Sequence, residues 1–263
     1  MFAFLKRFSS VLALWALSCF FASAIAGASL VSKPTIVLVH GAFAESSSWN
    51  SVITELAAKG YPTIAAANPL RGVKSDADYI ASIVSSIKGP VVLVGHSYGG
   101  SVISNAATGN PNVKALVYVA AFAPEKGETA VGLSGLFPGS TLGPTLAPPV
   151  VLADGSKDLY IRQDKLPAQF AADVPFGQAK QMAATQRPVT EAALNEGAGE
   201  AAWKSIPSWF IYGDQDKNIP AAALDFMAKR AGARKSVAIR GASHVVMLSH
   251  PQEVARLIEE AAK

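Results

Sequence analysis

A serine in a glycine-rich segment is the first candidate for chemistry in this sequence. The segment Gly95-His96-Ser97-Tyr98-Gly99 matches the pattern G-x-S-x-G and lies between an apolar run at 91–94 and a stretch with helical spacing. A serine on a sharp strand-to-helix turn needs small neighbours, because the backbone there is strained and crowded. The following helix would direct its first N–H groups and its dipole at the same point, which favours developing negative charge. We therefore predict that Ser97 is a nucleophile.

A serine hydroxyl needs a base, and four histidines could supply it. His244 follows a predicted strand at 234–240, so it is expected at the carboxyl edge of the sheet, where ligands bind in open α/β folds. His250 precedes a proline at a helix start and is expected at the surface or as a cap. His96 is expected to point away from the nucleophile, and His40 to tie its loop to its neighbours. We predict that His244 is the base.

Two aspartates in the segment 212–216 compete to orient this base. Asp216 lies deeper in the loop and has room to turn back toward His244. Asp214 directly follows a glycine and is suited to cap the turn through its own backbone. Glu125 is a third, more remote candidate. We predict that Asp216 is the carboxylate, with Asp214 as the alternative.

An oxyanion formed at Ser97 would need two N–H donors. One is the N–H of Tyr98, the residue after the nucleophile. The other is expected from the loop His40-Gly41-Ala42-Phe43, which follows the first predicted strand. The glycine permits a close backbone turn, so Ala42 is the predicted donor and Phe43 is the alternative.

These residues need a scaffold, and apolar runs do alternate with stretches of helical spacing along the chain. Such alternation makes βαβ units, so we expect an α/β fold with a mostly parallel, doubly wound sheet covered on both faces. The predicted strands are 35–39, 61–66, 91–94, 113–121, 206–212 and 234–240, and the predicted helices are 49–59, 75–87, 98–108, 221–231 and 251–262.

The alternation is interrupted at about 124–203. The part at 137–154 is rich in proline and glycine and is typical of a long loop, whereas 164–203 is typical of short helices. Insertions of this length are often functional, so we expect a helical cap inserted between sheet strands. Residues predicted to line an apolar pocket in and beside this cap are Phe43, Phe122, Phe137, Phe170, Met182, Trp203 and Val245. The alternative is that each aromatic side chain only packs the cap onto the sheet.

The first 26 residues have the layout of a secretory signal peptide. Lys6 and Arg7 precede an apolar run at 11–25, and Ala24-Ile25-Ala26 is a small-x-small pattern that signal peptidase cuts after. We expect removal of residues 1–26, leaving a single domain at 27–263 that is periplasmic or secreted. The alternatives are an uncleaved anchor helix, a cut after Ala22-Ser23-Ala24 and a lipoprotein site at Cys19.

Composition restricts the partners of the chain. Half of the 263 residues are apolar and 16% are charged, which suits one sizeable core. Loss of Lys6 and Arg7 with the signal would lower the formal charge from +4 to +2, which gives no support to a nucleic-acid partner. Cys19 is the only cysteine, so the mature chain would suit an oxidising compartment. We expect no metal, no membrane association after signal cleavage, and a monomer or homodimer.

Four segments together resemble the α/β-hydrolase superfamily, in particular a small bacterial esterase-like branch related to plant methylesterases and hydroxynitrile lyases. The resemblance covers essentially the whole mature chain, and it implies a triad of Ser97, Asp216 and His244 with Ala42 and Tyr98 at the oxyanion positions. The segments are His40-Gly41-Ala42-Phe43, Gly95-His96-Ser97-Tyr98-Gly99-Gly100, Gly213-Asp214-Gln215-Asp216 and Gly241-Ala242-Ser243-His244.

Residue chemistry separates the chain from some relatives on this fold. Haloalkane dehalogenases and epoxide hydrolases use an aspartate nucleophile where this chain has Ser97. The plant hydroxynitrile lyases use a late lysine in the pocket, and the nearest residue here is Lys217, which is expected to be a solvated loop charge.

The resemblance and the residue chemistry together favour one activity. We expect a carboxylesterase-type serine hydrolase without a cofactor, acting on small to medium apolar or aromatic esters through an acyl-enzyme. A small-molecule ester is then the expected partner. The alternatives are a cofactor-free dioxygenase or perhydrolase, a lyase, and a ligand-binding receptor with a relict triad.

Overall fold

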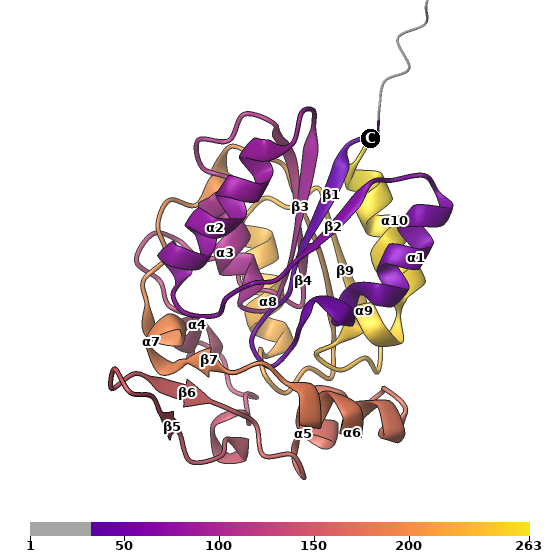
Figure 1. Cartoon of the computed structure of the whole chain (residues 1–263). Helices are drawn as coiled ribbons and strands as arrows, with labels where there is room; N and C mark the ends of the chain where they lie inside the picture. Colours follow the sequence, from indigo (N-terminus) through magenta and orange to yellow (C-terminus); the bar gives the residue numbers. More distant parts are fainter. Residues whose placement is uncertain (1–32) are drawn as a thin grey trace, which may run out of the picture. The chain divides into compact units, whose positions relative to one another are not determined.

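A six-stranded sheet forms the centre of the computed structural model, which describes residues 33–263 (Figure 1). All five strand pairs are parallel, in the order β2-β1-β3-β4-β8-β9. The strands are β1 (Thr35–Val39), β2 (Thr63–Ala66), β3 (Val91–His96), β4 (Val113–Val119), β8 (Ser208–Gly213) and β9 (Lys235–Ile239). The predicted signal segment 1–26 and Cys19 lie outside the described residues.

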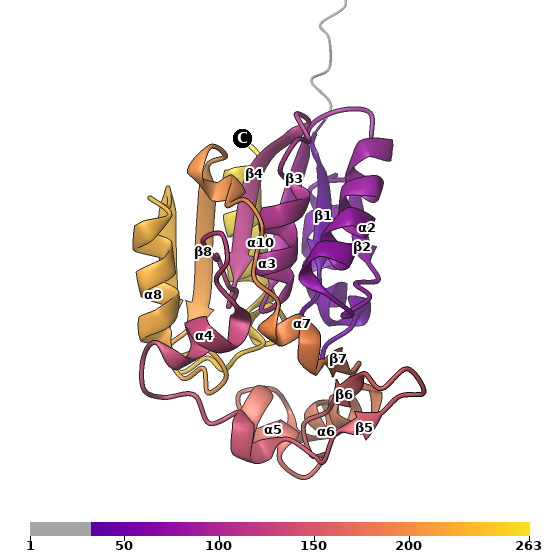
Figure 2. The same ribbon diagram turned by 90° about the vertical axis from the view of Figure 1, so that its left-hand side faces the viewer.

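Helices cover both faces of this sheet, as Figures 1 and 2 show. α1 (Asn50–Ala58) and α10 (Pro251–Ala261) pack together on one face. α2 (Val73–Ser86), α3 (Gly99–Ala106) and α8 (Ala221–Arg230) lie on the other. The central strand β3 is buried along its whole length, which explains its continuous apolar sequence. The predicted doubly wound α/β architecture is confirmed.

The short helices beside the strands were less visible in the sequence. A 3₁₀ turn, η1 (Ser46–Trp49), precedes α1, and α9 (Val246–Ser249) precedes α10. Both have only four residues, which is too short for a helical period to show. Within the described residues, no helix has the length and apolar character needed to cross a membrane.

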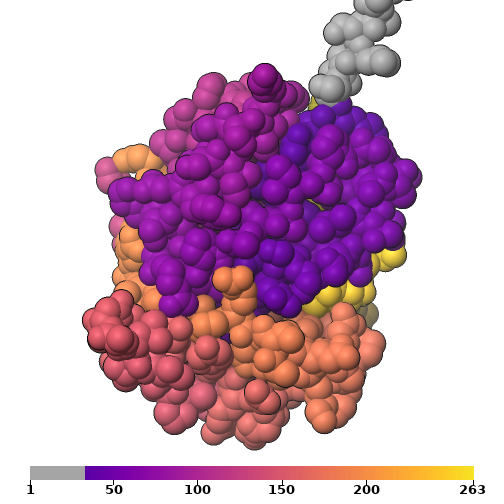
Figure 3. Space-filling model, viewed as in Figure 1, coloured from indigo at the N-terminus to yellow at the C-terminus, as the bar shows by residue number. Residues whose placement is uncertain are grey.

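The segment between β4 and β8 lies across the carboxyl ends of the strands, and in Figure 3 its surface adjoins that of the β1–α2 region. We call residues 124–203 the cap. Besides helices it contains a small antiparallel sheet, β5-β6-β7, where a loop and helices were predicted. Strands of two or three residues are too short for a visible alternation, so no sequence pattern predicts them. The cap elements are α4 (Ala130–Gly135), η2 (Gly143–Thr145), β5 (Val150–Val151), β6 (Lys157–Leu159), α5 (Leu166–Phe170), α6 (Phe176–Thr185), β7 (Val189–Thr190), α7 (Glu191–Asn195) and η3 (Ala202–Lys204).

Candidate active site

Ser97 occupies the turn between β3 and α3 with a φ of 54°, in the left-handed region that non-glycine residues rarely adopt. Its carbonyl oxygen accepts hydrogen bonds from the N–H groups of Gly100 (2.9 Å) and Phe122 (3.1 Å). Its own N–H donates to the carbonyl of Val119 at 3.3 Å. The neighbouring backbone therefore holds the strained conformation, and the side chain borders a cavity.

The turn closes only because its neighbours lack side chains. A Cβ atom on Gly95 would lie 2.6 Å from the carbonyl oxygen of Gly99, and one on Gly99 would lie 2.5 Å from that of Val39. Real Cβ atoms essentially never approach so closely. The expectation that these two glycines provide space for the nucleophile therefore matches the packing.

His244 and Asp216 form a buried pair beneath the same cavity. His244 Nδ1 lies 2.6 Å from Asp216 Oδ2, and the two side chains are 1% and 0% exposed. Asp216 Oδ1 accepts the N–H groups of Asn218 (2.8 Å) and Ile219 (3.0 Å), which fix the carboxylate. Because the carboxylate accepts, Nδ1 carries the proton and Nε2 carries the lone pair.

His244 Nε2 is positioned to act as a base. It is buried and has no hydrogen-bond partner within residues 33–263. His244 and Ser97 line the same cavity, so the candidate base and the candidate nucleophile face one shared space.

The competing carboxylates are engaged elsewhere. Asp214 is exposed, and its Oδ1 accepts the N–H of Gly241 at 2.7 Å, which ties the loops after β8 and β9 together. Glu125 forms an ion pair with Lys204 at 2.5 Å. The structure thus brings Asp216, and neither alternative, to His244.

Two other histidines, His40 and His96, contact the backbone of neighbouring loops. His40 Nε2 accepts the N–H of Asn68 at 3.0 Å, so it joins the loops after β1 and β2, and burial lowers its pKa to about 4. His96, expected to point away from the nucleophile, is not among the residues that line the cavity; its ring lies 4.7 Å from that of His244 and its Nε2 lies 3.2 Å from the His244 carbonyl oxygen. Burial holds the pKa of His96 well below its usual value. His96 is therefore neutral, and its ring packs beside the ring of His244.

The remaining histidine and the candidate lysine lie away from the chemistry. His250 is partly exposed, and its Nε2 lies 3.7 Å from Asp173. Lys217 is exposed and donates to the carbonyl of Ala168 at 3.1 Å. Within residues 33–263, no group of three or more histidine, cysteine, aspartate and glutamate side chains is arranged to hold a metal ion.

Two backbone N–H groups are available beside Ser97. The N–H of Phe43 donates to the carbonyl of Arg187 at 3.1 Å, which removes it as the alternative donor. No acceptor within the described residues engages the N–H of Ala42 or of Tyr98. A Cβ on Gly41 would lie 2.6 Å from Ser97 Cβ, so this loop rests directly on the nucleophile turn. The predicted donors are therefore those left free to bind an oxyanion.

The cavity above these residues has a volume of about 400 Å³. Three of the predicted pocket residues line it: Phe43, Phe122 and Phe170. Much of its wall comes from cap residues, and the aliphatic ones among them were not singled out in the sequence, because leucine has no distinguishing signal in a loop-rich segment. These are Val131, Leu142, Leu146, Leu159 and Leu194, and polar groups come from Ser134, Ser140, Glu191, Asn195 and Asn218.

Four predicted pocket residues do not line this cavity, and each has another contact. The ring of Phe137 packs against Phe226, with centroids 5.8 Å apart. Trp203 Nε1 donates to the carbonyl of Pro124 at 3.0 Å. Met182 borders a separate groove on the other side of Phe43, and Val245 is fully buried in the core. The aromatic rings of Phe137 and Trp203 therefore serve packing, which was the alternative prediction.

The profile of the alpha/beta hydrolase family matches residues 36–257. The chain belongs to this family. It is 29% identical over 247 residues to a pyrethroid hydrolase of Sphingobium wenxiniae, covering 86% of this chain and 87% of that one. It is 26% identical over 255 residues to an alpha-hydroxynitrile lyase of Arabidopsis thaliana, covering 84% and 94%.

A solved structure supports the same fold. The crystal structure of polyneuridine aldehyde esterase superposes with a TM-score of 0.76 at 18% identity, covering 88% of this chain and all of that one. The resemblance to this superfamily and to its plant members is confirmed, and family membership supports a hydrolase. 

Proposed function

We propose that this protein is a serine esterase that cleaves neutral, apolar or aromatic carboxylic esters through an acyl-enzyme. One observation carries the proposal: His244, which is buried against Asp216, and a strained Ser97 border one apolar cavity. The names of relatives such as the pyrethroid hydrolase agree with ester substrates.

The geometry supports a two-stage reaction. His244 Nε2 takes the proton of Ser97 as its oxygen attacks the ester carbonyl, and the N–H groups of Ala42 and Tyr98 stabilise the oxyanion. His244 then protonates the departing alkoxide. Water, activated by the same nitrogen, attacks the acyl-enzyme and releases the acid. Asp216 remains ionised and stabilises the protonated His244.

The cavity walls restrict the substrate. Within residues 33–263, neither lysine nor arginine lines the cavity, so this lining offers no cation to bind a charged carboxylate. Glu191, the carboxylate that lines it among the described residues, pairs with Lys157 at 3.1 Å. A neutral ester with an apolar acyl or alcohol part of small to medium size fits these walls.

Turnover of p-nitrophenyl esters of increasing acyl length by the unmodified protein and by Ser97→Ala tests the proposal. We expect the variant to lose at least about 10⁴-fold in kcat, because the nucleophile is removed. Circular dichroism checks that the fold is kept, and a fluorophosphonate probe should label Ser97 in the unmodified protein. Retained turnover in Ser97→Ala would contradict the serine mechanism, and a protein that neither turns over nor reacts with the probe would favour a binding role.

A further inference from the structure

A second buried carboxylate lies close to the nucleophile turn and has no part in the mechanism above. Asp76, in the first turn of α2, has 0% exposure. It accepts the hydroxyl hydrogen of Tyr98 at 2.9 Å and the backbone N–H of Arg71 at 3.1 and 3.2 Å. Burial raises the pKa of this carboxyl group, so its place in the core has a cost that packing alone would not require.

Asp76 contacts the residue that supplies one oxyanion donor. Tyr98 follows the nucleophile, and its N–H is free beside Ser97. Its ring is fully buried, and its hydroxyl, the side chain's only polar atom, bonds to Asp76. Tyr98 is thus held by the turn at its backbone and by Asp76 at the far end of its side chain.

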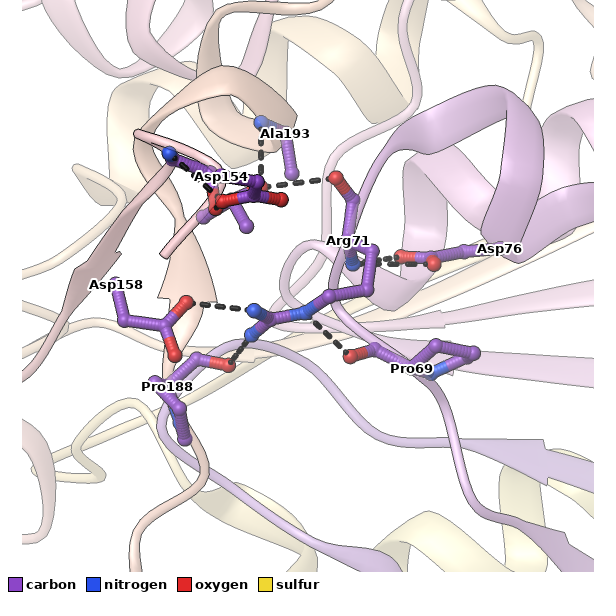
Figure 4. Close-up of polar contacts among 9 residues, drawn as sticks. Pro69, Arg71, Asp76, Asp154, Asp158, Pro188 and Ala193 are labelled. Atoms are coloured by element: carbon purple, nitrogen blue, oxygen red, sulfur yellow. Dashed lines mark hydrogen bonds and ion pairs between the residues drawn. The ribbon is translucent and has the colours of Figure 1, made fainter. Parts of the chain in front are cut away.

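Arg71 extends this contact into the cap, as Figure 4 shows. Its Nη1 lies 2.6 Å from Asp158 Oδ1 in β6, and its Nη2 donates to the carbonyl of Pro188, just before β7, at 2.9 Å. Its carbonyl oxygen accepts the hydroxyl of Thr190 in β7 at 2.9 Å. A single residue therefore holds two strands of the cap sheet while its N–H binds Asp76.

The two strands held in this way lead directly into the cavity wall. Asp158 is followed by Leu159, which lines the cavity. Thr190 is followed by Glu191, which lines it too. A displacement of this wall must therefore move the guanidinium of Arg71 or break its contacts.

We infer that Arg71 and Asp76 are positioning residues that link the cap sheet to the oxyanion hole through the Tyr98 hydroxyl. The inference rests on the proposed esterase function. With the cap seated, Asp158 fixes Arg71, Arg71 fixes Asp76, and Asp76 holds Tyr98 so that its N–H faces the oxyanion. Removal of the contact at Asp158 or of the contact at the Tyr98 hydroxyl therefore loosens the same donor, the N–H of Tyr98.

The experiment compares Tyr98→Phe, Asp158→Asn and the double variant in kcat and KM for one p-nitrophenyl ester. Tyr118→Phe is the matched control: its hydroxyl also forms a buried 2.8 Å hydrogen bond, with Ser104, but Tyr118 does not line the cavity. Asp158→Asn keeps the shape of a side chain at the cap edge, so it stays informative if Tyr98→Phe folds poorly. Thermal unfolding of all four variants measures their stability.

We expect Tyr98→Phe to lower kcat about 10-fold or more with little change in KM, since complete loss of a donor costs about 100- to 1000-fold. Asp158→Asn should lower kcat by a smaller factor, and the double variant should lose less than the product of the two single losses. Tyr118→Phe should lower the unfolding temperature but leave kcat unchanged.

Three outcomes would overturn the inference. Tyr98→Phe could match Tyr118→Phe in kcat, the two losses could multiply independently, or Asp158→Asn could raise KM without lowering kcat. In each of these cases Ser97-dependent turnover by the unmodified protein would still leave the proposed function standing. Turnover that does not depend on Ser97, or no ester turnover at all, would instead remove the proposed function and this inference with it.

Discussion

The loops at the carboxyl edge of the main sheet and the cap above them are held in place by different kinds of contact. At the sheet edge, backbone N–H groups hold the candidate site residues: Ser97 is fixed by N–H groups on its carbonyl, and Asp216 by two N–H groups on its carboxylate. The cap is joined to the body largely through side chains, such as Arg71 with Asp158 and Gln169 with Asn218 at 2.9 Å. On the proposed function, the reacting groups therefore lie in the region held by backbone N–H groups, and substrate choice depends on the region held by side chains.

The largest predicted effect concerns the loops at the sheet edge, where each of two nearby carboxylates is replaced by an amide. Asp216→Asn should lower kcat about 10⁴-fold, because an amide that donates to Nδ1 would fix the wrong tautomer of His244. Asp214→Asn should change kcat less than about threefold, because an asparagine oxygen can still accept the N–H of Gly241. Both are measured on one p-nitrophenyl ester, and a comparable loss in the two variants would contradict the assignment of Asp216.

The second-largest predicted effect concerns the part of the cap that lines the cavity. Leu146→Phe adds volume to the cap wall, so kcat/KM for long acyl chains should fall about 10- to 100-fold while the acetate ester changes little. Phe176→Leu is the control, because Phe176 lies in the cap but is 68% exposed and does not line the cavity. A uniform loss over all acyl lengths in Leu146→Phe would mean that the cap also positions the reacting groups, and the contrast between the two regions would fail.

The difference between the sheet-edge loops and the cap also explains which features could be predicted from the sequence. Turns at the sheet edge depend on local patterns: glycines around Ser97, and polar residues directly after apolar strands. The choice of Asp216 over Asp214 rested on loop geometry alone, and the structure places only Asp216 against His244. Family membership and fold were accessible for the same reason.

The cap was less accessible, because its contacts join residues far apart in the sequence. Arg71 and Asp158 are 87 positions apart, and neither belongs to a recognisable motif. The strands they join have two or three residues. Large aromatic residues were expected at the pocket, but an aromatic ring gains as much by packing in a core, and Trp203 and Phe137 do so.

The smallest predicted effect concerns Trp203, at the junction where the cap rejoins the main sheet. Trp203→Phe keeps a large ring but loses the hydrogen bond to the Pro124 carbonyl, so the free energy of unfolding should fall by about 1 kcal/mol. For a chain of this size that corresponds to a drop of about 2–4 °C in Tm. The preference for acyl length should not change, because Trp203 does not line the cavity. Thermal unfolding and the ester series measure both quantities on the same sample. A shift in acyl-length preference at unchanged Tm would contradict this prediction, because it would place Trp203 in the pocket wall. Trp203 would then have to be counted among the cap residues that contact substrate and not among those that only pack.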